Sequence, residues 1–177
     1  GVEYVVDFAD IPGSERSPED TGDDATDSDA DDNGQSDVVV LTSGEFDPTI
    51  DAGYYENASL GDFVFEDTNG DGIQDDGEPG VEGVAALLTQ DGVLTGDETV
   101  TLADGSYVFA DLVPGTYSVQ FVLPGGFSFT ETNTPGSDET NDSDADATMN
   151  GMTEEVTLTS GEDYEDLDAG LLNTGAT

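Results

Sequence analysis

The sequence contains no cysteine, no histidine and no lysine, and Arg16 is its one basic residue. Without cysteine there is neither a disulfide framework nor a thiol nucleophile. Without histidine the commonest general base and transition-metal ligand is absent. Because phosphate binding needs clusters of Lys or Arg, the sequence argues against a nucleic-acid partner. No apolar run approaches the roughly 18 residues of a membrane span, so membrane insertion is not predicted either.

What the chain has in excess is acid: 43 of its 177 residues are Asp or Glu, and the formal net charge is −42. Two carboxylates roughly 4 Å apart repel by about 4 kcal/mol at an effective dielectric of about 20, so this charge opposes compaction. The acidic residues are gathered in periodic loops, which favours divalent cations bound at specific sites. The alternative is a halophilic surface solvated by salt, and the two can coexist.

One stretch, residues 67–78, has the spacing of an EF-hand calcium loop at every ligand position. Gly72 stands at position 6, where the backbone must turn sharply. Calcium binds roughly six to eight oxygen atoms, and this spacing wraps a short loop around one ion. The alternative is an acidic, glycine-rich turn that binds nothing. The oxygen-bearing residues at positions 1, 3, 5, 9 and 12 are Asp67, Asn69, Asp71, Asp75 and Glu78, and the ligand at position 7 is the carbonyl of Ile73.

The segments around this loop are typical of strands and turns. An alternating, aromatic strand is predicted at residues 60–66, and another strand at residues 84–89. A hairpin is predicted with its turn at residues 103–105, and with Val100 and Leu102 facing inward. Because no helix flanks the loop, we expect ion-dependent rigidity and not the opening motion of a helical calcium sensor.

The second half of the chain repeats the order of the first, displaced by roughly 112 to 117 residues, about one small domain. The matched segments are 4–8 with 117–121, 11–13 with 123–125, 27–31 with 142–146, 41–45 with 158–162, and 51–53 with 168–170. The sequence therefore predicts tandem modules. The predicted parts are residues 1–57 as the C-terminal half of a preceding module, residues 58–172 as a complete module, and residues 173–177 as a tail or linker.

The predicted half-module would expose strand edges and one apolar face. Two explanations stay open at this point. A tandem array can be cut at an odd place, or a neighbouring chain can supply the missing strands. The second explanation is strand complementation, which would build a fibre.

Residues 59–84, SLGDFVFEDTNGDGIQDDGEPGVEGV, resemble the opening of the calcium-binding B module of bacterial serine-aspartate repeat surface adhesins. Residues 104–109, DGSYVF, and 114–119, PGTYSV, resemble the wider collagen-adhesin B-type signature. The resemblance implies an all-β fold of tandem prealbumin-like (reverse immunoglobulin-like) β-sandwich modules with calcium-binding loops. Phe65 stands where the family usually has Trp. Many collagen-adhesin B-type domains carry a Lys–Asn isopeptide crosslink, which is impossible here without lysine.

The resemblance also assigns Ca²⁺ ligands. Asp67, Asn69, Asp71, Ile73 (through its carbonyl), Asp75 and Glu78 would hold one ion. Further family sites point to Asp142, Asp144 and Asp146, and in the first copy to Asp27, Asp29 and Asp31. Glycosylation sequons begin at Asn57 and Asn141, although this motif is common by chance.

The function expected from these features is structural. It is a calcium-rigidified segment of an extracellular or cell-surface stalk or filament in a secreted prokaryotic protein, with adjacent copies of the same module or chain as partners. One alternative is an adhesin module that binds a glycan or host protein, and a second is a halophilic surface-layer-type protein. An enzyme is not expected, because the carboxylates lie in turn and ion-loop patterns that need no catalytic explanation.

Overall fold

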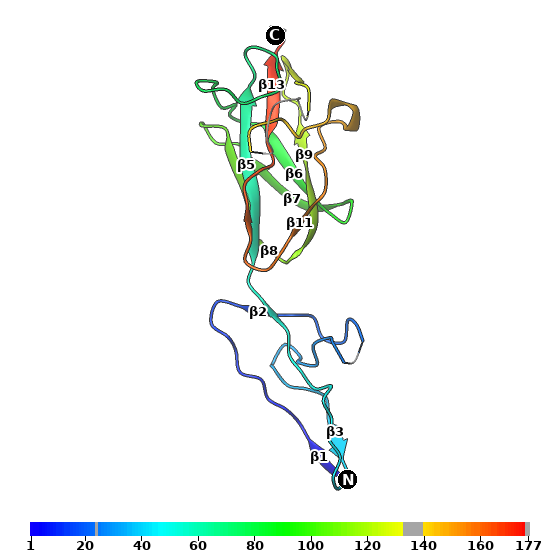
Figure 1. Cartoon of the computed structure of the whole chain (residues 1–177). Helices are drawn as coiled ribbons and strands as arrows, with labels where there is room; N and C mark the ends of the chain where they lie inside the picture. Colours follow the sequence, from blue (N-terminus) through cyan, green and yellow to red (C-terminus); the bar gives the residue numbers. More distant parts are fainter. Residues whose placement is uncertain (24, 133–139, 176–177) are drawn as a thin grey trace. The chain divides into compact units, whose positions relative to one another are not determined.

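The computed structural model describes residues 1–23, 25–132 and 140–175. The chain divides into two compact units, residues 1–57 and residues 58–177. The described residues are strands, turns and one 3₁₀ turn, η1 (Ala147–Met149), so the all-β prediction is confirmed (Figure 1). None of the described segments forms a helix long and apolar enough to cross a membrane.

The second unit is a sandwich of two sheets. The first sheet is built around β5, which pairs with β8 in antiparallel fashion and with β12 and β13 in parallel, while β13 also pairs with β10 (Figure 1). The second sheet is antiparallel with the order β11-β9-β6-β7. The strands are β5 (Ala58–Glu66), β6 (Ala85–Gln90), β7 (Val93–Val100), β8 (Ser106–Leu112), β9 (Gly115–Val122), β10 (Phe127–Phe129), β11 (Val156–Leu158), β12 (Asp163–Tyr164) and β13 (Ala169–Asn173).

The core lies between these sheets. In β6, β8 and β9, alternate apolar residues point inward, as the period of a strand requires; they are Ala86 and Leu88, Tyr107 and Phe109, and Tyr117, Val119 and Phe121. Tyr107 of β8 meets Phe121 of β9 edge to face, with ring centroids 5.3 Å apart. Burying each large apolar side chain contributes about 1.5–3 kcal/mol. The fully buried apolar residues include Leu60, Val64, Phe65, Val84, Leu88, Val119, Phe121, Leu158 and Leu171.

The prediction that the strands on either side of residues 103–105 pair as a hairpin is wrong. β7 bonds to β6 and β8 bonds to β5, so this turn carries the chain from one sheet to the other. Val100 and Leu102 are 48% and 63% exposed, and Thr101 between them is buried. Hydrogen bonds explain the difference: the Thr101 hydroxyl accepts from the N–H of Val84 and donates to the carbonyl of Val81. These bonds turn Thr101 toward the core, so its two neighbours face outward.

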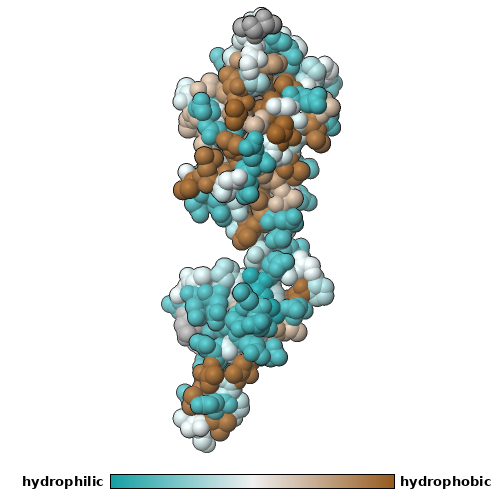
Figure 2. Space-filling model, turned by 180° about the vertical axis from the view of Figure 1, so that it is seen from behind, coloured by the Kyte–Doolittle hydropathy of each residue, from teal (hydrophilic) through white to brown (hydrophobic). Residues whose placement is uncertain are grey.

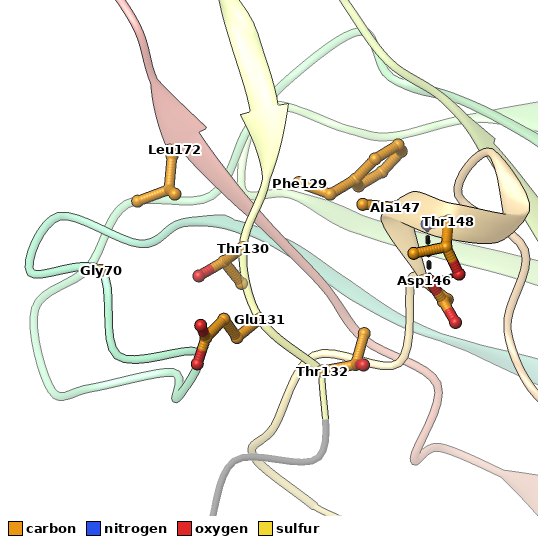
Figure 3. Close-up of a pocket in the computed structure, with 9 residues that line it drawn as sticks. All are labelled: Gly70, Phe129, Thr130, Glu131, Thr132, Asp146, Ala147, Thr148 and Leu172. Carbon is orange, nitrogen blue, oxygen red and sulfur yellow. Dashed lines mark hydrogen bonds between the residues drawn. The ribbon is translucent and has the colours of Figure 1, made fainter.

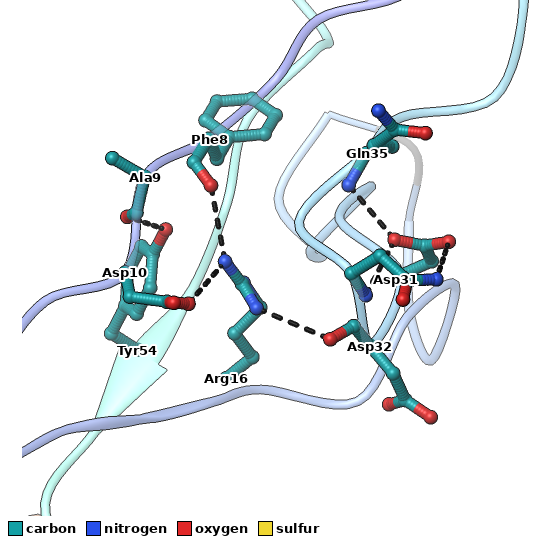
Figure 4. Close-up of polar contacts among 9 residues, drawn as sticks. Phe8, Ala9, Asp10, Arg16, Asp31, Asp32, Gln35 and Tyr54 are labelled. Carbon is teal, nitrogen blue, oxygen red and sulfur yellow. Dashed lines mark hydrogen bonds and ion pairs between the residues drawn. The ribbon is translucent and has the colours of Figure 1, made fainter.

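In the first unit β1 (Val2–Tyr4) pairs with β3 (Val39–Leu41), and β2 (Glu15–Arg16) pairs with β4 (Tyr54–Tyr55). All four of these strands are short, with two or three residues each. The Arg16 guanidinium holds neighbouring segments together (Figure 4). It lies 2.6 Å from the Asp10 carboxylate, donates to the Phe8 carbonyl at 3.0 Å, and stands 5.9 Å from the centre of the Tyr54 ring.

The register of the first unit repeats that of the second. Tyr4 lies opposite Val39 in β1–β3, as Tyr117 lies opposite Val156 in β9–β11. The β2–β4 pair stands in the same relation to β10–β13. The repeat in the sequence is therefore also a repeat of strand pairing.

The surroundings of the repeated strands differ between the units. Tyr117 is 3% exposed because it belongs to the core cluster that also contains residues of β5, β6 and β8, whereas Tyr4 is 49% exposed. Val2, Val40 and Phe46 are also exposed, and Figure 2 shows hydrophobic side chains gathered over β1 and β3. The described part of residues 1–57 contains no counterpart of β5, β6 and β8 to cover them.

Candidate metal centre

The EF-hand-like loop, residues 67–78, leaves the end of β5 with Asp67 turned inward. The Asp67 carboxylate is 1% exposed, and it accepts hydrogen bonds from the N–H groups of Gly70 at 2.6 Å and Gly72 at 2.9 Å and from the Thr130 hydroxyl. Both glycines have φ near +79°, which a residue with a Cβ adopts only with strain. Burial raises the pKa of Asp67, but these donors outweigh it and lower the pKa overall.

Three further predicted ligands meet on the outer side of the loop. The side-chain nitrogen of Asn69 donates to Asp71 at 3.0 Å and to Asp75 at 2.8 Å. A polar group with positive character thus stands between two carboxylates. The loop keeps this shape because the Asp71 carboxylate also accepts from the N–H of Ile73 at 3.0 Å.

Glu78 closes the loop. One oxygen of its carboxylate accepts from the N–H and the hydroxyl of Thr68 at 2.7 and 3.0 Å, and the other accepts from the N–H of Asp75 at 3.2 Å. The last predicted ligand therefore reaches back to the start of the loop.

The loop is also tied to a distant segment. Ile73 forms a bridge with Asp142, and the N–H of Gln74 donates to the carbonyl of Asn141 at 2.7 Å. Asn141 of the second sequon is consequently half-buried beside the loop, whereas Asn57 of the first is exposed. Anything that rigidifies residues 67–78 will act on this segment too.

The second predicted ligand group does not gather at one point. Asp142 is 5% exposed, whereas Asp146 caps η1 by accepting from the N–H and the hydroxyl of Thr148 at 2.6 and 2.7 Å. Asp144 turns the other way and accepts from the N–H of Asp168 at 2.8 Å. The alternating carboxylates therefore serve different parts of the unit.

Their counterparts in the first unit behave alike. Asp29 accepts from the N–H of Asp51 at 2.7 Å, as Asp144 does from Asp168. Asp31 caps its own turn through the N–H groups of Asn33 and Gln35, both at 2.8 Å (Figure 4). These bonds lower the pKa of Asp31.

Asp27 accepts from the N–H of Gly22 at 2.9 Å. Across the described ranges of both units, no three acidic side chains are grouped closely enough to hold a metal ion as they stand.

A hollow of about 620 Å³ lies beside the EF-hand-like loop, between Gly70 and η1 (Figure 3). Phe129, Thr130 and Leu172 contribute to its wall, together with the hydrogen-bonded pair of Asp146 and Thr148 at the opposite side (Figure 3). Thr130 therefore lines the hollow and also bonds to the buried Asp67.

Thr130 is a contributor that the sequence analysis missed. It lies 63 residues from Asp67 in the chain, so no local pattern connects them. The repeat offers one weak indication of its role. Ser17 bonds through its N–H to the Gly53 carbonyl as Thr130 bonds to Gly170, so a hydroxyl residue recurs at this place.

Comparison with known proteins identifies a protein family that this chain matches. The model of the SdrD B-like domain matches residues 58–171. Bone sialoprotein-binding protein of Staphylococcus aureus strain MRSA252 is 42% identical over 116 residues. Serine-aspartate repeat-containing protein E is 42% identical in strain MSSA476 and 41% identical in strain Mu50, over the same length. Each match covers 64% of this chain and 10% of the relative, so the shared stretch spans about a tenth of those proteins.

Proposed function

Because the chain belongs to the family of SdrD B-like domains, a family of surface-adhesin modules, we propose that it is a structural segment of an extracellular stalk stiffened by calcium. The EF-hand-like loop carries this proposal. It places an oxygen-bearing side chain at each of the five side-chain ligand positions of the calcium-loop pattern, at the end of the central strand β5. The protein would act by keeping its shape, and no catalytic role is needed.

The chemistry of the loop fits calcium. All of the side-chain metal ligands proposed in this loop would bind through carboxylate or amide oxygens, which hard cations prefer. The Asn69 amide already stands between the carboxylates of Asp71 and Asp75. Turning this amide by 180° exchanges its nitrogen for its oxygen, at the cost of the hydrogen bond that the oxygen now accepts from the N–H of Asp71 at 3.0 Å. Three oxygen ligands would then face one point, where an ion could replace the amino group.

The position of the loop explains why an ion would stiffen the unit. The residue just before it, Glu66, donates its N–H to the Pro79 carbonyl just beyond it, and Gln74 bonds to Asn141. An ion bound at residues 67–78 would therefore fix the crossing from β5 toward β6 and the segment at 141–143 together. A net charge of −42 gives further reason to bind divalent cations, because like charges repel in the compact state.

Calcium titration with thermal unfolding tests this proposal. Asp75→Asn removes a proposed ligand, whereas Asp76→Asn next to it removes the same charge from a non-ligand position. Calcium at 100 times its dissociation constant should stabilise the wild type by about 2.7 kcal/mol. Asp75→Asn should lose most of this gain and Asp76→Asn should keep it. A melting temperature that does not change when a chelator is added would contradict the proposal.

We further propose that strands like β5, β6 and β8 of an adjacent copy cover the apolar face of β1 and β3. The support is the shared register, since the equivalent residues of β9 and β11 are covered by those strands in the second unit. The chain should then associate with itself as its concentration rises. Sedimentation should show that Val2→Ser with Tyr4→Ser weakens association, while Val108→Ser, an exposed site on β8, does not. A chain that stays monomeric at every concentration would contradict this proposal.

A further inference from the structure

Three asparagines of the chain are followed directly by glycine, and one of these pairs lies inside the EF-hand-like loop. The pairs are Asn33–Gly34, Asn69–Gly70 and Asn150–Gly151. Asparagine is chemically labile, and before glycine it loses its amide when the glycine nitrogen attacks the side-chain carbon, since glycine has no Cβ to hinder the approach. All three asparagines are exposed, so solvent access to their side chains does not distinguish them. The bonding and the space around each glycine do.

The N–H groups of the three glycines have different partners. The N–H of Gly70 donates to the Asp67 carboxylate at 2.6 Å. Those of Gly34 and Gly151 donate to backbone carbonyl oxygens, both at 2.8 Å. A carboxylate accepts a proton far more readily than an amide carbonyl does, so it can act as a general base. Of these three glycines, Gly70 is therefore the one whose N–H already contacts a base.

The side chain of Asn69 is held in a way that favours the same attack. Its oxygen accepts from the N–H of Asp71 at 3.0 Å, so a donor already faces the atom that becomes negative when the carbon is attacked. Its nitrogen donates to the carboxylates of Asp71 and Asp75 at 3.0 and 2.8 Å. The amide is thus fixed at both ends and does not have to be ordered before it reacts.

Ring closure also moves the glycine backbone, so the space around each glycine matters. Gly70 is exposed, and an added Cβ there would make one ordinary van der Waals contact, at 3.5 Å. Gly34 and Gly151 are buried. A Cβ at Gly34 would collide with the Arg16 guanidinium, and one at Gly151 would collide with the Phe129 ring. Packing therefore restrains those two glycines, whereas Gly70 has room to move.

We propose that Asn69 is a site of spontaneous deamidation, at which the loop modifies its own backbone. The N–H proton of Gly70 passes to the Asp67 carboxylate, and the glycine nitrogen bonds to Cγ of Asn69. The Cγ–Nδ2 bond then breaks, and ammonia leaves with the transferred proton. Water from the solution opens the resulting cyclic imide at either of its carbonyls, which yields aspartate or isoaspartate at position 69.

Both products change the loop. The amino group of Asn69 now stands between the carboxylates of Asp71 and Asp75, and either product replaces this amide with a carboxylate. Like charges then face one another, and isoaspartate also lengthens the backbone by one methylene group beside Gly70. The modified loop should therefore be less ordered than the original one when no cation is bound.

Peptide mapping by mass spectrometry follows all three sites in one sample of the full chain, incubated at neutral pH with chelator. Asn69 should deamidate at least about tenfold faster than Asn33 and Asn150, a small part of the roughly 10²–10⁴-fold that a positioned acid or base contributes. In urea that unfolds the chain, the three rates should approach one another, because each asparagine then has only its neighbouring glycine. Chelator keeps calcium out of the comparison, so failure of the calcium proposal would not alter this result.

Two variants test the role of Asp67, and serine is used because a new asparagine would add a deamidation site. Asp67→Ser removes the base and should slow the reaction at Asn69. Asp76→Ser removes the same charge from an exposed position of the loop and should leave the rate unchanged. Circular dichroism should show that each variant is folded; if Asp67→Ser is not, the comparison of the three sites in the wild type decides. Equal rates at those sites in the folded chain would overturn the inference, and so would a rate at Asn69 that a folded Asp67→Ser does not lower.

Discussion

Replacing Asp67 with Asn tests how the EF-hand-like loop is held even before calcium is considered. The carboxylate accepts three hydrogen bonds, from the N–H groups of Gly70 and Gly72 and from the Thr130 hydroxyl, inside the protein. Asn has the same shape but only one oxygen. Its amino group must point at a donor, so at least one bond is lost and a buried donor is left unsatisfied.

The magnitude follows from these bonds. A hydrogen bond to a charged group contributes about 1.5–3 kcal/mol, and an unsatisfied buried donor costs about 1–3 kcal/mol. We therefore expect Asp67→Asn to lower the free energy of unfolding by about 3 kcal/mol in the presence of chelator. In calcium the loss should be larger, by up to about 2.7 kcal/mol at 100 times the wild-type dissociation constant, because the variant also lacks a ligand.

Urea unfolding followed by circular dichroism measures both quantities. Asp76→Asn is the control, because it removes a charge from an exposed position of the same loop. Thr130→Ala, combined with Asp67→Asn in a double-mutant cycle, isolates the contribution of the hydroxyl. The reasoning would be refuted by a loss below about 1 kcal/mol for Asp67→Asn in chelator, since that is less than one charged hydrogen bond contributes.

Three other predictions follow from the packing and the repeat. Gly61→Ala would place a methyl group against the Tyr107 carbonyl oxygen and should cost about 3 kcal/mol in urea unfolding, whereas Gly125→Ala meets open space and should change little. Hydrogen bonds from threonine N–H and hydroxyl groups lower the pKa of both Glu45 and Glu162, so NMR should show both titrating below ordinary glutamate, with the stability they contribute lost as pH falls through the lowered values. A chain containing only the second unit should keep the full calcium-dependent rise in melting temperature; a lost rise would mean that the first unit supplies ligands.

The features that the sequence predicted well are local ones. Alternation of apolar residues is enough to indicate β5, because one face of a strand is buried and its period is two. The sharp turn predicted at Gly72 is present, with a φ value that glycine adopts without strain. The bond from Glu78 back to Thr68 was not predicted, although it also lies within this loop. Short-range spacing therefore predicts the turn, and the ligand role of the loop stays a prediction.

The features that the sequence did not predict depend on contacts across the sandwich. Thr101 faces inward and Val100 faces outward because the chain changes sheets after β7. An alternating sequence does not by itself show which of its two faces is buried, because that depends on how the strand pairs. The link from Thr130 to Asp67 depends on β10 lying near the end of β5, two strands that β13 holds in one sheet. Asp168 is likewise fully buried beside residues far from it in the chain, among them Asp62 and Tyr107. Each of these outcomes is a property of the assembled sheets.

The repeat shows how two copies of one pattern balance acidic charge in different ways. By strand register, Arg16 of β2 occupies the place of Phe129 of β10, since Arg16 lies opposite Tyr54 as Phe129 lies opposite Leu171. In the second unit the aromatic ring packs against the core. In the first unit the guanidinium binds backbone carbonyls and the Asp10 carboxylate, and it helps to lower the pKa of Asp31. The second unit contains no basic residue, so no side chain of its own balances its buried carboxylates in this way.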